Sequence, residues 1–375
     1  MNINFHYFAI KTLASLAGFD DGQAQQIAKY SQFVDDFNAP LVMACSNIPE
    51  EITASNTLDL YIRAASGNFR PVSTGFTNPF EYATLILRQE QRFTLSPFHF
   101  MPFDASAAGQ AGARVIPLAF GGNSLVDGLL HKEIRKYHAL GRDVGSHICN
   151  TRSIVLMRIG MLLHIFADSH AHQMFTGFIS QANRVNITEV QNNITGEDIT
   201  AAARAGIRGL FAGAKSNAPP IGHVQAGHNP DLSHIGFGFS YDARQDGSGV
   251  YFRNNTDAFM DAAWHVFRYL ASCTGLANSW SKNKEKLRQG LLVEMPRRDT
   301  MRGLAWHWGQ LFRNVGYHYD AGEITRGFRL QPTSISQMTR SGFTAYSREF
   351  YEYNIMANEI LVELYGARPR ARFGF

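Results

Sequence analysis

The chain has 375 residues, of which 45% are hydrophobic and 12% aromatic, and a formal net charge of +4 at pH 7. This length allows one large domain or two, and the apolar content is ample for a buried core. A charge this small does not by itself indicate nucleic-acid binding. The three cysteines are scattered and form no Cys-x-x-Cys pair, which excludes a zinc ribbon and favours a reducing compartment.

The N-terminal stretch MNINFHYFAIKTLASLAGF lacks the basic start and long apolar run of a signal peptide. No segment of the sequence approaches the roughly twenty uninterrupted apolar residues of a membrane-spanning helix. We therefore expect a cytoplasmic protein with no transmembrane segment, leaving leaderless export open. The sequence leaves the oligomeric state unknown.

Residues 5–18 have helical spacing of apolar side chains, and Asp20 then resembles the cap of a second helix that runs into Asp35 and Asp36. Two acids at a helix C-terminus oppose the helix dipole, at a cost of roughly 0.3–1 kcal/mol each. A nearby cation would explain them, and so would an exposed, frayed helix end.

Residues 40–120 are rich in proline and irregular, with possible short strands at Phe69–Ser73 and Val115–Phe120. His99 lies between aromatic residues and prolines in SPFHFMPFD. Such a stiff loop suits a ligand that must be held in place, although packing alone would also explain it. A helix is predicted next, over Leu125–Leu140.

The segment Ser153–Gly177 reads as one long helix that is apolar all round, as buried helices are. Its polar residues His164, Asp168 and His172 descend one face in successive turns, while His170 should point elsewhere. A buried carboxylate needs a partner, either a metal ion or a network of hydrogen bonds. Eight residues of helix rise about 12 Å, so one ion cannot bind both outer histidines. Either Asp168 bridges two ions or the helix ends early.

A helical stretch is expected over Ile187–Ala214, followed by the loop IGHVQAGHNPDLSH. Loops that carry His and Asp this densely are usual places for sites, so at least one of His223, His228 and Asp231 should be a metal ligand. A small hairpin is expected at Asp242–Arg253. The remainder should be helical, at Thr256–Ser272, Asn283–Leu292, Thr300–Val315 and Ser336–Tyr365.

In chain order, the segments FHYFAI, QFVDD, SPFHFMP and LHIFADSHAH resemble the zinc-dependent phospholipase C superfamily, which includes single-strand-specific nucleases. The chain also looks like a member of a little-characterised bacterial group with that N-terminal pattern. The resemblance covers roughly residues 1–235. It implies a mainly α, multi-helix bundle with irregular loops and at most a small β-hairpin. We expect a single domain over 1–375, with a possible helical extension at 255–375.

The resemblance also implies a cofactor of two or three zinc ions, or another divalent transition metal. Of the two adjacent acids Asp35 and Asp36, we predict that Asp36 is a metal ligand. Both are candidates to orient or deprotonate the attacking water. By implication, one zinc would be held by His99, His164, Asp168 and an Asp at 35 or 36, a second by His6 with Asp168, and a third by His172 with His223 and Asp231.

The chain differs from this family at two ligand positions. Mature family members begin with a Trp whose amine and carbonyl bind metal, whereas MNINF precedes His6 here. The family's last ligand pair is His-x3-Asp or His-x3-Glu, but Asp231 lies three residues after His228 and eight after His223. Either histidine could therefore be the ligand.

The expected function is that of a metal-dependent phosphoesterase, with a phospholipid or a single-stranded nucleic acid or nucleotide as substrate. Zinc ions would clamp phosphate oxygens and lower the pKa of a bound water. The alternative is a non-catalytic helical binding or toxin-related module with a structural metal. The sequence has no His-Asp dipeptide and no His-Glu-x-x-His, which excludes two other metal hydrolase classes. The aromatic residues Phe98, Phe100 and Phe103 could contact an acyl chain or bases, or only pack.

Overall fold

The computed structural model describes residues 1–38, 43–50, 67–69, 71–75, 91–140, 152–210, 219–241, 249–276, 279–294, 300–330 and 345–365. The prediction of a mainly α protein is confirmed within these ranges. The chain divides into two compact units, the first made of Met1–Gln32 and Ile86–Tyr319, the second of Phe33–Leu85 and Asp320–Phe375. Neither boundary lies at residue 255, where a helical extension was considered. That the chain is a single domain stays a prediction.

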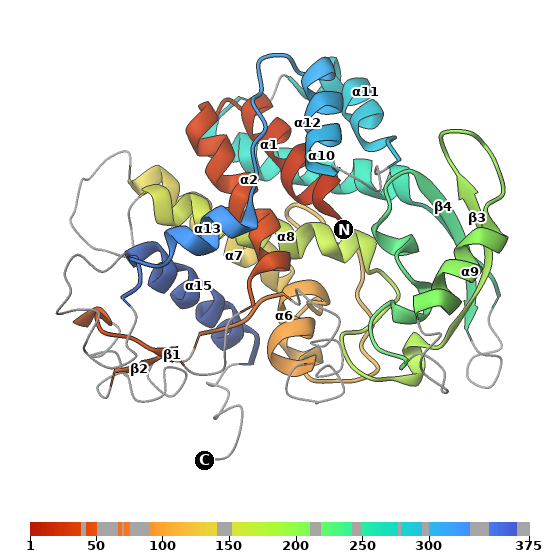
Figure 1. Ribbon diagram of the computed structural model, residues 1–375, viewed down its shortest axis with the longest axis horizontal. Coiled ribbons are helices and arrows are strands. Elements are labelled where there is room, and N and C mark those ends of the chain that lie inside the picture. The colour runs from red at the N-terminus through yellow and green to blue at the C-terminus, as the bar shows by residue number, and fades with distance from the viewer. Residues whose placement is uncertain are drawn as a thin grey trace. The chain divides into compact units, whose positions relative to one another are not determined.

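The first unit contains most of the helices (Figure 1). The predicted N-terminal helix is present as a π-helical turn that runs directly into an α-helix. The predicted helix that begins after Asp20 is also present, and it continues past the unit boundary at Gln32. The helices are η1 (Asn4–Ala9), α1 (Ile10–Leu16), α2 (Asp21–Asp36), η3 (Gln91–Leu95), α6 (Ser96–His99), α7 (Leu125–Ala139), α8 (Arg152–Ala171), α9 (Thr200–Leu210), α10 (Asn255–Thr274), α11 (Trp280–Leu291) and α12 (Thr300–Leu311).

Side-chain caps explain where two of these helices begin. The Ser124 hydroxyl accepts a hydrogen bond from the Asp127 amide at 3.1 Å and starts α7. Asn254 accepts one from the Asp257 amide at 3.4 Å and starts α10. Gly275, with a φ of 78°, ends α10 in the left-handed conformation that glycine adopts most easily.

Helix α8 is the core helix of the first unit. All its side chains from Ile154 to Ala171 are buried. It is the one described helix that is long and apolar enough to cross a membrane, but its apolar stretch lies entirely inside the protein. The helix ends at Ala171, six residues before the predicted end at Gly177.

Close packing of α8 against α2 depends on Gly160. A Cβ atom on this residue would lie 2.3 Å from the carbonyl oxygen of Ile27. We therefore expect Gly160→Ala to lower the free energy of unfolding by about 1–3 kcal/mol, because one of the two helices must shift. Urea unfolding measures this change.

The matched control is Gly128→Ala on α7. A Cβ atom there would meet nothing within 4 Å. Alanine favours a helix over glycine, so this variant should be unchanged or more stable by up to about 1 kcal/mol. Equal effects of the two substitutions would show that α8 and α2 do not pack this closely.

A three-stranded antiparallel sheet corrects the sequence prediction of at most a small hairpin. Its strands, in order, are β3 (Val185–Asn192), β4 (Ile235–Tyr241) and β5 (Tyr251–Asn254). The predicted helical stretch Ile187–Ala214 was wrong in its first part, where β3 lies. Helix α9 follows and lies against this sheet (Figure 1), with Ile207 packed on its core. Strands β4 and β5 pair as a hairpin would, while residues 242–248 lie outside the described ranges.

The two short strands predicted before residue 120 are mostly absent. Of the described residues in Phe69–Ser73, Phe69 belongs to a strand, β2 (Asn68–Phe69), which pairs with β1 (Met43–Ala44), and residues 71–73 do not, while Arg70 lies outside the described ranges. The segment Val115–Phe120 forms no strand.

The second unit contains β1, β2 and two described helices, α13 (Ala321–Gly327) and α15 (Arg348–Tyr365). Helix α15 confirms part of the predicted helix Ser336–Tyr365, whose first residues lie outside the described ranges. Aromatic rings pack against one another in this unit; the ring centroids of Phe37 and Tyr353, for example, lie 4.8 Å apart.

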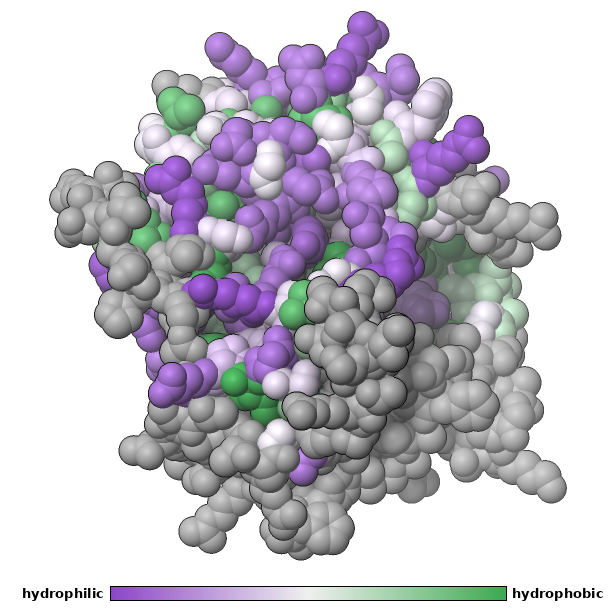
Figure 2. Space-filling view, turned by 60° about the vertical axis from the view of Figure 1, so that its left-hand side comes forward, coloured by the Kyte–Doolittle hydropathy of each residue, from purple (hydrophilic) through white to green (hydrophobic). Residues whose placement is uncertain are grey.

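Hydrophilic residues cover much of the described surface in Figure 2, with hydrophobic ones scattered among them.

Candidate metal centre

The carboxylate of Asp168 lies at the centre of the predicted ligands. Its Oδ2 atom is 3.2 Å from His99 Nδ1 and 3.2 Å from His164 Nε2, and those nitrogens are 3.3 Å apart. Atoms that bind one zinc tetrahedrally at about 2.0–2.1 Å lie about 3.3–3.4 Å from one another. The three atoms therefore have the mutual spacing that a single ion requires.

The other oxygen of Asp168 faces a different set of groups. Oδ1 is 3.0 Å from His6 Nε2 and accepts a hydrogen bond from the amino group of Met1. That amino group also lies 3.4 Å from Asp231 Oδ1. The two oxygens of Asp168 thus contact different groups. The MNINF segment, which differs from the resembled family, brings the Met1 amine to the same carboxylate.

A second cluster consists of His172, His223 and Asp231. His172 Nε2 is 3.1 Å from Asp231 Oδ1, and His223 Nε2 is 3.3 Å from Asp231 Oδ2. The Nδ1 atoms of the two histidines lie 2.6 Å from the His99 carbonyl and 2.9 Å from the Gly227 carbonyl. Since a carbonyl can only accept, each Nδ1 must carry the proton and donate. Each Nε2 then presents a lone pair toward Asp231, as in histidines oriented for metal binding.

The choice between His223 and His228 falls on His223. His228 is exposed and joins none of the His, Cys, Asp and Glu clusters among the described residues. Two short 3-10 turns, Val224–Ala226 and Asn229–Asp231, fold the loop back on itself with Gly227 between them at a φ of 61°. The fold of this loop therefore brings together two ligands eight residues apart.

Phe100 supports this second cluster by packing. Its ring stacks on that of His172, with centroids 4.5 Å apart and planes 15° apart. A Cβ atom on Gly222 would lie 2.8 Å from the Phe100 ring, so the loop must have glycine there. Phe98 and Phe100 are 0% and 5% exposed. Their role is packing, one of the three interpretations that the sequence left open.

His164 and His172 both reach Asp168 because each lies four residues, about one helical turn, from it. Helix α8 ends at Ala171, and the His172 amide continues its hydrogen-bond pattern by donating to the Asp168 carbonyl at 2.8 Å. His172 Nδ1 lies 3.6 Å from Asp168 Oδ2. His170 points elsewhere as predicted, with its Nε2 2.9 Å from the Leu118 carbonyl.

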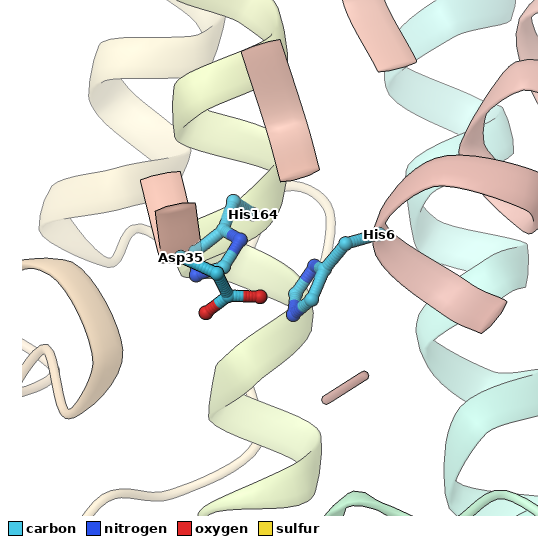
Figure 3. Close-up of side chains that lie close together, drawn as sticks. All are labelled: His6, Asp35 and His164. Atoms are coloured by element: carbon cyan, nitrogen blue, oxygen red, sulfur yellow. The ribbon is translucent and has the colours of Figure 1, made fainter. Parts of the chain in front are cut away.

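Figure 3 shows His6, Asp35 and His164 with their side chains directed toward one another. One possible ligand atom from each lies within 4.8 Å of the others. Asp35 is on the last turn of α2, a continuous helix whose residues up to Gln32 belong to the first unit. Asp36, the metal ligand predicted from the sequence, joins none of the clusters among the described residues.

The family of the protein emerges from a comparison with family models. Residues 1–359 match a family described as a family of unknown function (DUF6765). The chain belongs to this family. No curated protein and no solved structure matches the DUF6765 chain. Its chemistry is therefore inferred from the side chains themselves.

Electrostatics favour the protonation states that metal ligands need in this DUF6765 protein. Burial lowers the pKa of His164 and that of His223 to about 4. Burial opposes ionisation of Asp168, but His172, the Met1 amine and His164 outweigh it and hold the pKa of that carboxyl well below its usual range. Neutral imidazoles beside ionised carboxylates are the forms that bind metal.

These shifts predict how the stability of the metal-free DUF6765 protein depends on pH. The pKa of His164 falls from 6.5 to about 4 on folding, so the unfolded chain takes up this proton first as the pH drops. Stability should be full above about pH 6.5 and fall between pH 6.5 and 4, by at most about 3 kcal/mol for this residue. Denaturant unfolding of the metal-free protein at pH 7 and pH 4.5 measures the change. His164→Gln should weaken the dependence, and a flat dependence in the wild type would contradict it.

Proposed function

We propose that the protein is a metal-dependent phosphoesterase that hydrolyses a phosphodiester, with two or three zinc ions or another divalent transition metal as cofactor. The observation that carries this proposal is the placement of Asp168, whose two oxygens face separate sets of nitrogen ligands. On the Oδ2 side, the atoms Asp168 Oδ2, His99 Nδ1 and His164 Nε2 have the mutual spacing of atoms that bind one ion. When bound, such ions would supply positive charge for the phosphate oxygens and lower the pKa of water.

The chain's own residues divide this work by their exposure. His6, His164 and Asp168 have side chains that are at most 1% exposed. Side-chain exposure rises to 10% for His99 and to 18% for both His223 and Asp231. A substrate therefore approaches from the side of these last three residues, while the buried three hold the centre together.

The acids have separate roles in the proposed reaction. Asp168 stays ionised and holds two ligand sets at one carboxylate. Asp35 and Asp36 are the candidates to orient or deprotonate the attacking water. A carboxylate within reach of the water can accept its proton as the phosphoester is attacked.

The second candidate function is a non-catalytic binding module with a structural metal. The near-complete burial of His6, His164 and Asp168 favours it, since structural zinc sites are closed to water. The partial exposure of Asp231 and His223 favours the hydrolase. Both candidates require metal and differ in whether the metal-loaded protein turns over a substrate.

Hydrolysis assays separate the two candidates. Phospholipid vesicles, single-stranded DNA and single-stranded RNA are each incubated with the protein and added zinc. We expect release of product from at least one of them, loss of that activity with a chelator, and its absence in His223→Ala. A metal-loaded wild type that hydrolyses none of the three substrates would favour the structural module.

A further inference from the structure

Arg253, near the end of β5, binds two separate parts of the backbone. Its Nη1 donates hydrogen bonds to the carbonyls of His170 at 3.0 Å and Ala171 at 2.6 Å. Its Nη2 donates one to the carbonyl of Pro230 at 3.2 Å. The guanidinium therefore connects the C-terminus of α8 with the loop after residue 219.

Two of the residues that Arg253 binds, Ala171 and Pro230, come immediately before candidate metal ligands of the same cluster. His172 follows Ala171, and Asp231 follows Pro230. The Nε2 atom of His172 and the Oδ1 atom of Asp231 are only 3.1 Å apart. The Arg253 side chain thus binds the backbone next to both of these ligands.

Asn255 completes the support of the loop. Arg253 Nε donates to Asn255 Oδ1 at 2.8 Å, which fixes the orientation of the amide. The Asn255 Nδ2 then donates to the carbonyls of Asn229 at 2.7 Å and Leu232 at 2.8 Å. The carbonyls on both sides of Asp231 are therefore held from the junction of β5 and α10.

The charge of Arg253 suits this position. A cation is favourable at a helix C-terminus, where the last carbonyls are not bonded within the helix. The guanidinium also lies over the Phe237 ring, 4.9 Å from its centroid, which restricts its plane. Lysine would keep the charge but lacks the planar set of donors that binds several carbonyls at once.

We infer that Arg253 is a positioning residue for the cluster of His172, His223 and Asp231, and that it sets the separation of the α8 ligand from the loop ligands. This inference rests on the proposed function, since it requires that the cluster bind a metal ion. Supporting groups of this kind typically change metal affinity by about 10–100-fold when removed.

The experiment compares Arg253→Lys and Arg253→Met with the wild type and with a matched control, Arg204→Lys. Arg204 on α9 also binds backbone carbonyls, those of Ile187 at 2.7 Å and Thr188 at 3.2 Å, but it contacts no candidate ligand. Metal-free proteins are titrated with Zn²⁺ in competition with a chromophoric chelator. Titration with Co²⁺ reports ligand geometry through its visible spectrum, and circular dichroism reports the fold.

We expect both Arg253 variants to bind one metal equivalent about 10–100-fold more weakly, with an altered Co²⁺ spectrum, and Arg204→Lys to bind like the wild type. The metal equivalent that binds more weakly should be the one that His223→Ala no longer binds. In the His223→Ala background, Arg253→Lys should therefore leave the affinity for the remaining metal unchanged. If Arg253→Met does not fold, Arg253→Lys decides the result.

Three results would overturn the inference in distinguishable ways. Unchanged metal affinity in a folded Arg253→Lys protein would remove the positioning role and leave the proposed function intact. Unfolding of Arg253→Lys would show that the residue serves the fold as a whole. Failure of the wild type to bind any metal would remove the proposed function, and the role of Arg253 with it.

Discussion

Asp168→Ala is expected to lose bound metal and phosphodiester hydrolysis together. Both carboxylate oxygens are in use, Oδ2 toward His99 and His164 and Oδ1 toward His6 and the Met1 amine. Removing them takes one ligand from each of two adjoining ligand sets. Metal ions contribute several kcal/mol to stabilising phosphoryl-transfer transition states, so the rate should fall about a thousandfold or more.

The matched control for this substitution is Asp261→Ala on α10. Asp261 is also a carboxylate beside histidines, 3.5 Å from His170 Nδ1 and 3.8 Å from His265 Nε2. It belongs to none of the metal-ligand groups among the described residues. This variant should keep its metal and activity within about twofold. If Asp168→Ala kept both as well, α8 would be a purely structural helix.

Metal removal is expected to lower the thermal unfolding temperature of the wild type by about 10 °C. Without metal ions, the Met1 amino group is the one full positive charge that the described contacts bring to the two buried or partly buried carboxylates Asp168 and Asp231. A ligand present at 1,000 times its dissociation constant stabilises a protein by about 4.1 kcal/mol, and each kcal/mol shifts the midpoint by about 2–4 °C in large domains. Differential scanning calorimetry with and without a chelator measures the shift.

The reversibility of this shift identifies its cause. Adding back Zn²⁺ should restore the wild-type unfolding temperature, while Mg²⁺ should not, because imidazole ligands favour transition metals. Asp168→Ala should respond to neither chelator nor Zn²⁺. An unfolding temperature that chelation leaves unchanged in the wild type would indicate that the clusters are held by hydrogen bonds alone.

Much of the candidate centre followed from sequence spacing because its middle part lies on one helix. The spacing of His164 and Asp168 places them on one face of any helix, and the apolar residues around them made burial predictable. The sequence does not show which of Asp35 and Asp36 faces the site. Adjacent side chains on a helix point about 100° apart, and the rotation of the helix about its axis is not known from sequence.

Other parts of the centre depend on contacts between distant segments. The positive φ of Gly227 reverses the loop so that His223, not His228, meets Asp231. The role of Arg253 could not be predicted from the sequence, because it binds backbone carbonyls and every residue type has one. The position of the Met1 amine beside Asp168 could not be predicted either, because it depends on where η1 packs.

The missed sheet has a local physical reason. Strand β3 has the alternating burial of a half-buried strand, but a bulge between Ile187 and Glu189 shifts the register, so the period of two does not persist. In β4, Gly236 and Gly238 alternate with Phe237 and Phe239, and glycine is uncommon in strand interiors. Both strands therefore lacked the pattern by which strands are recognised.

The metal content of the purified protein tests the candidate centre most directly. The wild-type protein is prepared without chelators and its transition metals are counted by elemental analysis per protein chain. We expect two or three equivalents of zinc or another divalent transition metal, falling in Asp168→Ala and unchanged in Asp261→Ala. Less than one equivalent in the wild type, also after incubation with zinc, would contradict the existence of a metal centre at Asp168.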